Sequence, residues 1–186
     1  MQFAADYLED LKKTISGLDP DALGKAISWM KEARDNGRMV FACGNGGSAA
    51  IASQMVTDIV KGASYGHKAR IRMIGLTDSI GIITAYANDV NYDCVFAEQL
   101  RNFAQQGDLL FAISGSGNSR NVLRAVEYAN SIGCRTIGLT TAYGGALKDM
   151  VNLTLEVPNN HMGRLEDCFF LMTHIIAYAF MEDVAG

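Results

Sequence analysis

Residues 39–50 read MVFACGNGGSAA, and they join a short apolar run to a segment of small residues through a loop with three glycines and an asparagine. The apolar run is typical of a buried strand, and the segment that follows is typical of a helix. A simple connection needs one glycine at most, so the additional glycines indicate a backbone that a ligand approaches closely. The stretch therefore predicts a strand–loop–helix unit with a binding site at the end of its strand.

The same alternation of strand and helix continues along the chain. Short and mostly apolar segments predict strands at 39–43, 71–76, 108–113, 134–139 and 152–157. Helical patterns lie between and after them, at about 48–61, 79–88, 91–104, 119–132, 144–150 and 163–183. This order predicts an α/β fold, a three-layer αβα sandwich around a five-stranded parallel sheet, with a flavodoxin-like strand order as the first expectation.

Two further helices are predicted before the first strand. Apolar residues recur at helical spacing in the first of them, and Asp19 followed by Pro20 is typical of the capped start of the second. These helices, at about 3–36, fall outside the alternation of the α/β core, at about 38–186, so we expect them on the edge of the domain or on another subunit. No low-complexity linker divides the chain, so residues 1–186 are predicted to form a single domain.

The composition limits the classes of function. A net charge of −4 argues against a nucleic-acid partner. The longest apolar run, Cys168–Met181, is too short to cross a bilayer, so no membrane partner is expected. The N-terminal segment is acidic and amphipathic, unlike a signal peptide, and the four cysteines are too widely spaced for a zinc knuckle or a disulfide framework. These features predict a cytoplasmic protein with reduced thiols.

A second loop of unusual chemistry follows a predicted strand. Residues 114–119 read SGSGNS and precede a predicted helix. Glycines admit a ligand close to the backbone, serine hydroxyls donate hydrogen bonds and the helix N-terminus offers free N–H groups, a combination that suits a phosphate without a lysine. A pair of flexible turns with N-capping serines explains the same residues, and the pattern alone leaves both interpretations open. Neither loop matches a Walker motif or the dinucleotide fingerprint.

The pair GNGGSA (44–49) and ISGSGNS (113–119) resembles the SIS (sugar isomerase) domain, and within that family the chain is most similar to the phosphoheptose isomerases. The resemblance covers nearly the whole length. It implies an isomerase that interconverts a ketose phosphate and an aldose phosphate through an enediol, with sedoheptulose 7-phosphate and a heptose 7-phosphate as the pair, and it implies a homotetramer. The alternative is a non-catalytic SIS protein, either a phosphosugar-binding regulator or a protein-binding scaffold.

The resemblance also implies which residues bind the substrate. The sugar would contact residues of the first loop, a later turn and the last helix, namely Asn45, Gly46, Gly47, Ser48, Asn88, Asp89 and Glu166. The phosphate would contact the serine loop, namely Ser114, Gly115, Ser116 and Ser119. Gly115 stands where the family commonly has threonine. Taken alone, the pair Asn88–Asp89 is typical of an ordinary Asx turn, and Arg120 could either neutralise a phosphate or face solvent.

Moving a proton between adjacent carbons through an enediol needs a base near the carbon and an acid near the carbonyl oxygen. Phosphoheptose isomerases carry a glutamate on the helix after the first loop and a histidine on the last helix. The matching positions are Asp58 and His174, so the resemblance implies that these two residues are catalytic. By itself, Asp58 is typical of a solvated helix residue, and His174 is typical of a packed core histidine.

A metal site follows from the same resemblance. Metal-dependent members carry a histidine four residues before the glutamate and a glutamine eight residues before the last histidine, whereas this chain has Gln54 and Glu166 there. Asp58, Glu166 and His174 could still hold one divalent cation such as zinc, with Gln54 as a weak fourth ligand. The missing histidine lowers the preference for zinc. The aspartate side chain is also one methylene shorter than glutamate, so its carboxylate lies closer to the helix backbone.

Overall fold

The computed structural model describes residues 2–182, so residue 1, residues 183–186 and the predicted end of the last helix at residue 183 lie outside the described part. One parallel five-stranded sheet has the order β2-β1-β3-β4-β5. Its strands are β1 (Met39–Cys43), β2 (Arg72–Gly75), β3 (Leu109–Ile113), β4 (Arg135–Thr141) and β5 (Leu153–Val157). The predicted flavodoxin-like order is confirmed.

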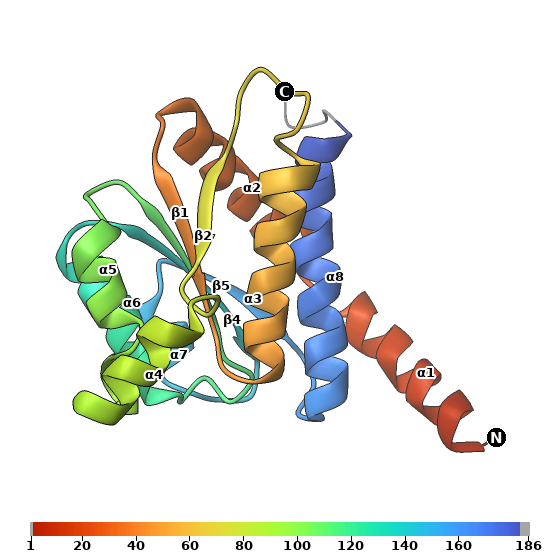
Figure 1. The fold of residues 1–186 in the computed structure, drawn as a ribbon. Helices are drawn as coiled ribbons and strands as arrows, with labels where there is room; N and C mark the ends of the chain where they lie inside the picture. The colour runs from red at the N-terminus through yellow and green to blue at the C-terminus, as the bar shows by residue number, and fades with distance from the viewer. Residues whose placement is uncertain (1, 183–186) are drawn as a thin grey trace.

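Helices cover both faces of the sheet (Figure 1). One face carries α2 (Pro20–Asp35), α3 (Gly47–Thr57) and α8 (Met162–Met181), and the other carries α4 (Ile80–Asp89), α5 (Ala97–Phe103), α6 (Arg120–Ser131) and α7 (Leu147–Met150). The buried residues form two apolar clusters, one under each helical layer, which confirms the three-layer sandwich. Among residues 2–182, no helix is both long and apolar enough to cross a membrane.

The two N-terminal helices differ in their placement. α2 packs on β1, β3 and β5 and against α8, and it buries Leu23, Ala26 and Met30 in the core. The expectation that α2 would lie on the domain edge or on another subunit is therefore wrong, because its apolar stripe covers the sheet. By contrast, α1 (Gln2–Ser16) extends away from the body and leaves Phe3 and Leu8 exposed (Figure 1).

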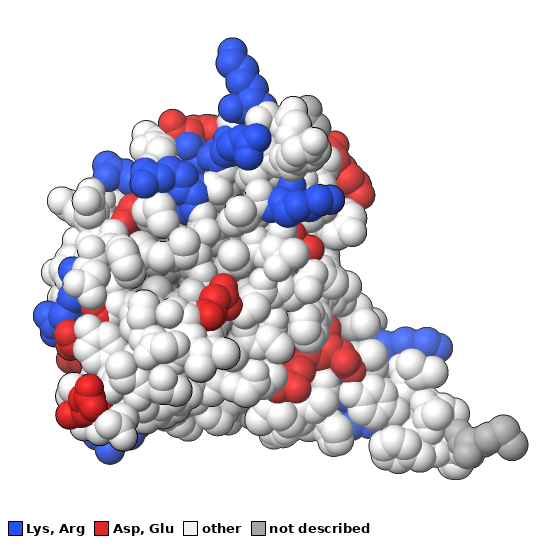
Figure 2. Space-filling model, in the orientation of Figure 1, with Lys and Arg blue, Asp and Glu red and all other residues white. Residues whose placement is uncertain are grey.

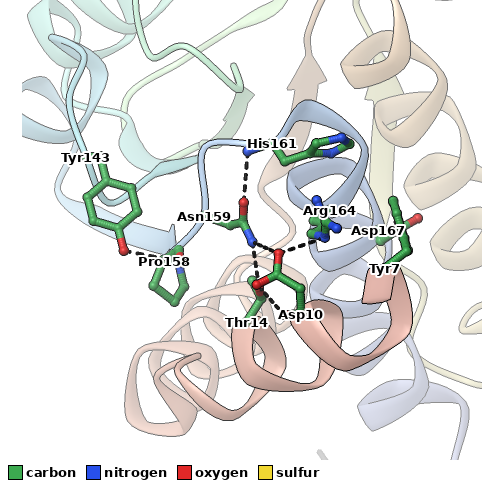
Figure 3. Close-up of polar contacts among 9 residues, drawn as sticks. All are labelled: Tyr7, Asp10, Thr14, Tyr143, Pro158, Asn159, His161, Arg164 and Asp167. Atoms are coloured by element: carbon green, nitrogen blue, oxygen red, sulfur yellow. Dashed lines mark hydrogen bonds and ion pairs between the residues drawn. The ribbon is translucent and has the colours of Figure 1, made fainter. Parts of the chain in front are cut away.

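A polar cluster attaches α1 to the first turns of α8 (Figure 3). Tyr7 donates a hydrogen bond from its hydroxyl to Asp167 Oδ2 at 2.6 Å, and this bond raises the pKa of Tyr7. Arg164 Nε lies 2.8 Å from Asp10 Oδ2, which also accepts a hydrogen bond from Asn159 Nδ2 at 3.2 Å. α1 is thus held by directed polar contacts, while much of its apolar surface stays exposed.

Three predicted helices have different boundaries in the structure. The regular turns of α3 stop at Thr57, and a single π-helical turn, η1 (Asp58–Gly62), follows, so Asp58 stands at the junction. The segment predicted as one helix at 91–104 is divided into the 3₁₀ turn η2 (Tyr92–Cys94) and α5. α7 begins three residues later than predicted, because Gly144 and Gly145 have φ angles of 152° and 92°, which a helix does not allow.

The two glycine-rich loops leave the sheet at the same edge. β1 and β3 are neighbours, and Cys43 pairs with Ala112 at the last position of β1. The loop after β3 contains Gly117 with a φ of 66°, and a Cβ atom there would lie 2.8 Å from Thr140 Oγ1. Only glycine suits both the angle and the space. The fold therefore places the two predicted ligand loops side by side.

Candidate functional site

A pocket of about 250 Å³ lies where the two loops meet. Its walls come from the ends of β1 and β3 and from the first turns of α3 and α8. It is lined by Asn45, Ser48, Ile113, Ser114, Gly115, Ser116, Ser119, Met162 and Glu166. We call it the serine-loop pocket. Most of the predicted substrate-binding residues converge here. Gly47 does not line the pocket, but it lies against Glu166, whose carboxylate fills the space where a side chain at position 47 would begin.

The serine loop presents hydroxyl groups at the start of α6. Ser114 is buried, and its Oγ donates a hydrogen bond to Ser119 Oγ at 3.1 Å. Ser116 is exposed, and its Oγ accepts a hydrogen bond from the Asn118 backbone N–H at 3.2 Å. Ser119 occupies the N-cap position of α6 without a capping hydrogen bond from its side chain. These groups are neutral donors placed at a helix end that favours negative charge.

No lysine or arginine is among the residues that line the pocket. On the face shown in Figure 2, most Lys and Arg side chains gather at the end where β1 and β2 begin, which is opposite to the pocket. Arg120 Nε lies 3.1 Å from Asp93 Oδ2, so this arginine, left open by the sequence, is paired with a carboxylate. The pocket thus combines neutral donors on one side with the Glu166 carboxylate on another.

Asn45 is held by two residues that the sequence did not single out. Asn45 and Asn121 exchange reciprocal amide hydrogen bonds, each of 2.9 Å, and Asn121 is buried. Tyr92 donates from its hydroxyl to Asn45 Oδ1 at 2.9 Å. Nothing in the spacing of these three positions predicts the contact, because it depends on how η2 and α6 lie against the first loop.

The two predicted catalytic residues face each other from α8 and the end of α3. Asp58 Oδ2 lies 3.5 Å from His174 Nε2, and Gln54 Nε2 donates a hydrogen bond to Asp58 Oδ1 at 2.9 Å. The Asp58 side chain is 14% exposed and that of His174 is 44% exposed. Asp58 Oδ2 is buried and accepts no hydrogen bond, and His174 is its ion-pair partner. We call Asp58 and His174 the acid–base pair.

Comparison with known proteins identifies the family of this chain. The family model described as SIS domain matches residues 3–141. The phosphoheptose isomerase of Aliarcobacter butzleri is 38% identical over 170 residues, which cover 91% of this chain and 89% of that protein. Solved phosphoheptose isomerases from Francisella tularensis and Neisseria gonorrhoeae each superpose with a TM-score of 0.88, at 29% identity and over 97% of both chains. The chain belongs to the SIS domain family, and within it to the phosphoheptose isomerases.

Some predicted site residues of this SIS domain lie outside the serine-loop pocket. Asn88 and Asp89 end α4, are exposed, and bond to each other through Asn88 Nδ2 and Asp89 Oδ1 at 2.8 Å. They do not line the pocket of this chain. Gly46 does not line it either, and its φ of 54° shows that it serves the turn that opens α3. Their roles toward a sugar stay predictions.

The predicted metal ligands of the SIS domain are not assembled into one site. Glu166 and His174 are eight residues apart on α8, which corresponds to roughly 12 Å along the helix axis. Glu166 lies against Gly47 at the start of α3, whereas Gln54 and Asp58 lie further along that helix. Within residues 2–182, no group of three or more His, Cys, Asp or Glu side chains is arranged to hold a metal ion. The four residues therefore do not fit the ion that the resemblance implied.

The glycine at position 115 is linked to a residue of α8. A Cβ atom at Gly115 would lie 2.8 Å from Met162 Sδ, so the threonine common in the family would require the flexible Met162 side chain to shift. The four cysteines are free and buried, as expected from their spacing. Burial raises the pKa of Cys43 to about 12 and that of Cys134 to about 11, so these thiols are unreactive near neutral pH.

Proposed function

We propose that the chain is an aldose–ketose phosphosugar isomerase that converts sedoheptulose 7-phosphate to a heptose 7-phosphate. The observation that carries the proposal is the serine-loop pocket, where hydroxyl and backbone donors from two strand ends converge. The membership of the phosphoheptose isomerase family and the names of the relatives support this substrate pair.

The phosphate would occupy the serine loop. Ser116 and Ser119 would supply hydroxyl donors, Ser114 would orient Ser119 through its own hydrogen bond, and the first turn of α6 would supply N–H groups and a positive dipole end. The sugar would extend toward Asn45 and toward the Glu166 carboxylate, which occupies the space beside Gly47. This arrangement would hold the phosphorylated end of the sugar and leave the reacting carbons free for proton transfer.

The acid–base pair would carry out that transfer. Asp58 Oδ2 would take the proton from the carbon next to the carbonyl group, and His174 would donate a proton to the carbonyl oxygen, which gives the enediol. Returning the proton from Asp58 to the neighbouring carbon, while His174 recovers one from the enediol hydroxyl, would complete the isomerisation. The hydrogen bond from Gln54 to Oδ1 would keep the carboxylate in place, with Oδ2 toward His174.

The enzyme would work as a homotetramer whose active site draws on more than one subunit. Asp58 follows Ser48 by ten residues, roughly 15 Å along the helix, so the acid–base pair lies well away from the pocket of its own chain. His174 is partly exposed and lies beside the exposed residues Ile175 and Tyr178, a surface that a symmetric neighbour could cover. A monomer in light scattering at micromolar concentration would contradict the assembly.

The free, buried cysteines favour a reducing cytoplasm.

The test is incubation of the purified protein with sedoheptulose 7-phosphate in D₂O, followed by NMR. We expect an aldose product and deuterium at the carbon that exchanges its proton through the enediol. Neither product nor exchange with this ketose or with a panel of other ketose and aldose phosphates would refute the isomerase. If calorimetry still showed binding of the sugar phosphate, the alternative of a phosphosugar-binding regulator would replace it, which the unusual residues Gln54, Asp58 and Glu166 make worth testing.

A further inference from the structure

The amide pair of Asn45 and Asn121 has a fixed orientation. Asn121 Oδ1 accepts two hydrogen bonds, from Asn45 Nδ2 at 2.9 Å and from the Val122 backbone N–H at 3.0 Å. A backbone N–H can only donate, so the oxygen of Asn121 must face Val122. The nitrogen of Asn121 therefore faces Asn45 Oδ1, and the usual ambiguity between amide oxygen and nitrogen is removed for both residues.

Tyr92 completes the set of contacts. Its hydroxyl donates to Asn45 Oδ1 at 2.9 Å, and the Asn121 amide donates to the same oxygen at 2.9 Å. An amide oxygen has two lone pairs, so Asn45 Oδ1 has no capacity left for a ligand. Asn45 Nδ2 has two N–H groups and uses one of them on Asn121. One N–H group of Asn45, a residue that lines the pocket, remains.

We infer that Asn121 and Tyr92 are positioning residues that make Asn45 a donor-only contact for the sugar. The inference rests on the proposed function, in which Asn45 meets the substrate. It assigns the chemistry of the ligand atom: an oxygen that accepts a hydrogen bond, such as a carbonyl oxygen or a hydroxyl lone pair, and not an O–H group that needs an acceptor. Neither positioning residue lines the pocket, so each acts only through Asn45.

The decisive variant is Tyr92→Phe, because Tyr92 is 50% exposed and loses only its hydroxyl. Losing one neutral hydrogen bond that orients Asn45 should raise the KM for sedoheptulose 7-phosphate about threefold to tenfold. Inorganic phosphate, used as a competitive inhibitor, should keep its inhibition constant, because it binds the serine loop. Tyr143→Phe is the matched control: this exposed tyrosine also gives up one hydroxyl bond, to the Pro158 carbonyl oxygen at 3.4 Å, and the KM should stay unchanged.

Asn121→Asp provides the second variant. The aspartate keeps an acceptor for Asn45 Nδ2 and for Val122, but it replaces the donor that faces Asn45 Oδ1 with an oxygen. Two oxygens in contact should turn the Asn45 amide away and raise the KM about tenfold to a hundredfold. Asn121 is buried, so this variant is interpreted only if its melting temperature shows a folded protein. Tyr92→Phe decides the question in either case.

The outcomes separate the inference from the function it rests on. A wild-type chain that neither binds nor isomerises the sugar phosphate would overturn the proposed function and this inference with it. An active wild-type chain, combined with a Tyr92→Phe variant that behaves like Tyr143→Phe, would overturn the inference alone. The inference would also fail if Tyr92→Phe raised both the KM and the phosphate inhibition constant and lowered the melting temperature, since that pattern indicates a merely structural role.

Discussion

The serine-loop pocket and the acid–base pair are built from different chemistry. The pocket consists of glycines, hydroxyl groups and backbone donors that follow two buried strands, and its one charged lining residue is Glu166. The acid–base pair consists of two titratable side chains on neighbouring helices, with Gln54 fixing one carboxylate oxygen. The pocket can therefore hold an anion without proton transfer, and the pair can move a proton without holding the anion. The two tasks should be separable by mutation.

The largest effect is expected at the acid–base pair. Asp58→Asn removes the proposed base, and His174→Ala removes the proposed acid, so each should lower kcat about 10²- to 10⁴-fold. The dissociation constant of inorganic phosphate should stay unchanged in calorimetry, because its proposed contacts lie in the pocket. Wild-type turnover in Asp58→Asn would show that Asp58 has no catalytic role, and it would favour the alternative of a phosphosugar-binding regulator.

The serine loop should show the reverse pattern. Ser116→Ala removes a hydroxyl that is proposed to bind the phosphate, so the affinity for the sugar phosphate should fall about 10- to 100-fold. The melting temperature should change little, because Ser116 is exposed. Ser131→Ala is the matched control at the other end of α6, where the hydroxyl bonds the Tyr128 carbonyl oxygen. Equal affinities of the two variants in calorimetry would remove the loop from the site.

The fold was predictable because its signals are local. Apolar runs and glycine-rich turns identify the strands, and their alternation with helices leads to a parallel sheet. The pocket followed from the same logic, since the loops after β1 and β3 must meet once those strands are neighbours. Asn121 and Tyr92 could not be found in this way, because their contacts with Asn45 depend on the exact placement of separate segments.

The predicted metal ligands are not grouped in the described part of one chain, and their role stays a prediction. Four-residue and eight-residue spacings place side chains on one helix face, but they do not show whether side chains on separate helices meet at one point. Glu166 and His174 share a face of α8 and are separated by roughly two helical turns. α2 shows the same limit, because a helix outside the strand–helix alternation can still cover the sheet when its apolar stripe fits there.

Subunit mixing tests whether the pocket and the pair of different chains work together. Coexpressed Asp58→Asn and Ser116→Ala chains should form mixed tetramers in which some sites combine an intact pocket with an intact pair from a neighbour. Random mixing should restore about a quarter of the wild-type kcat/KM, well above either variant alone. Activity no higher than the average of the two parents would show that each chain supplies both halves of its own site.

The smallest effect concerns the one charge inside the pocket. The Glu166 carboxylate lines the pocket in which the phosphate is proposed to bind, so the two negative charges repel each other. Glu166→Gln keeps the shape and removes the charge, and it should tighten sugar-phosphate binding about twofold to fivefold at low ionic strength. Calorimetry at increasing salt should show the gain fading as the repulsion is screened.

Asp167→Asn is the control for that measurement, because it removes the same charge from the adjacent position of α8, where the side chain faces Tyr7 and not the pocket. Its affinity for the sugar phosphate should equal that of the wild type. If Glu166→Gln weakened binding instead, the carboxylate would be accepting hydrogen bonds from the sugar hydroxyls, and that gain would exceed its repulsion of the phosphate. The pocket would then recognise the sugar through a charged acceptor, Glu166, as well as through the Asn45 donor. Substrate binding in the pocket would depend on a titratable side chain, as proton transfer at the acid–base pair does.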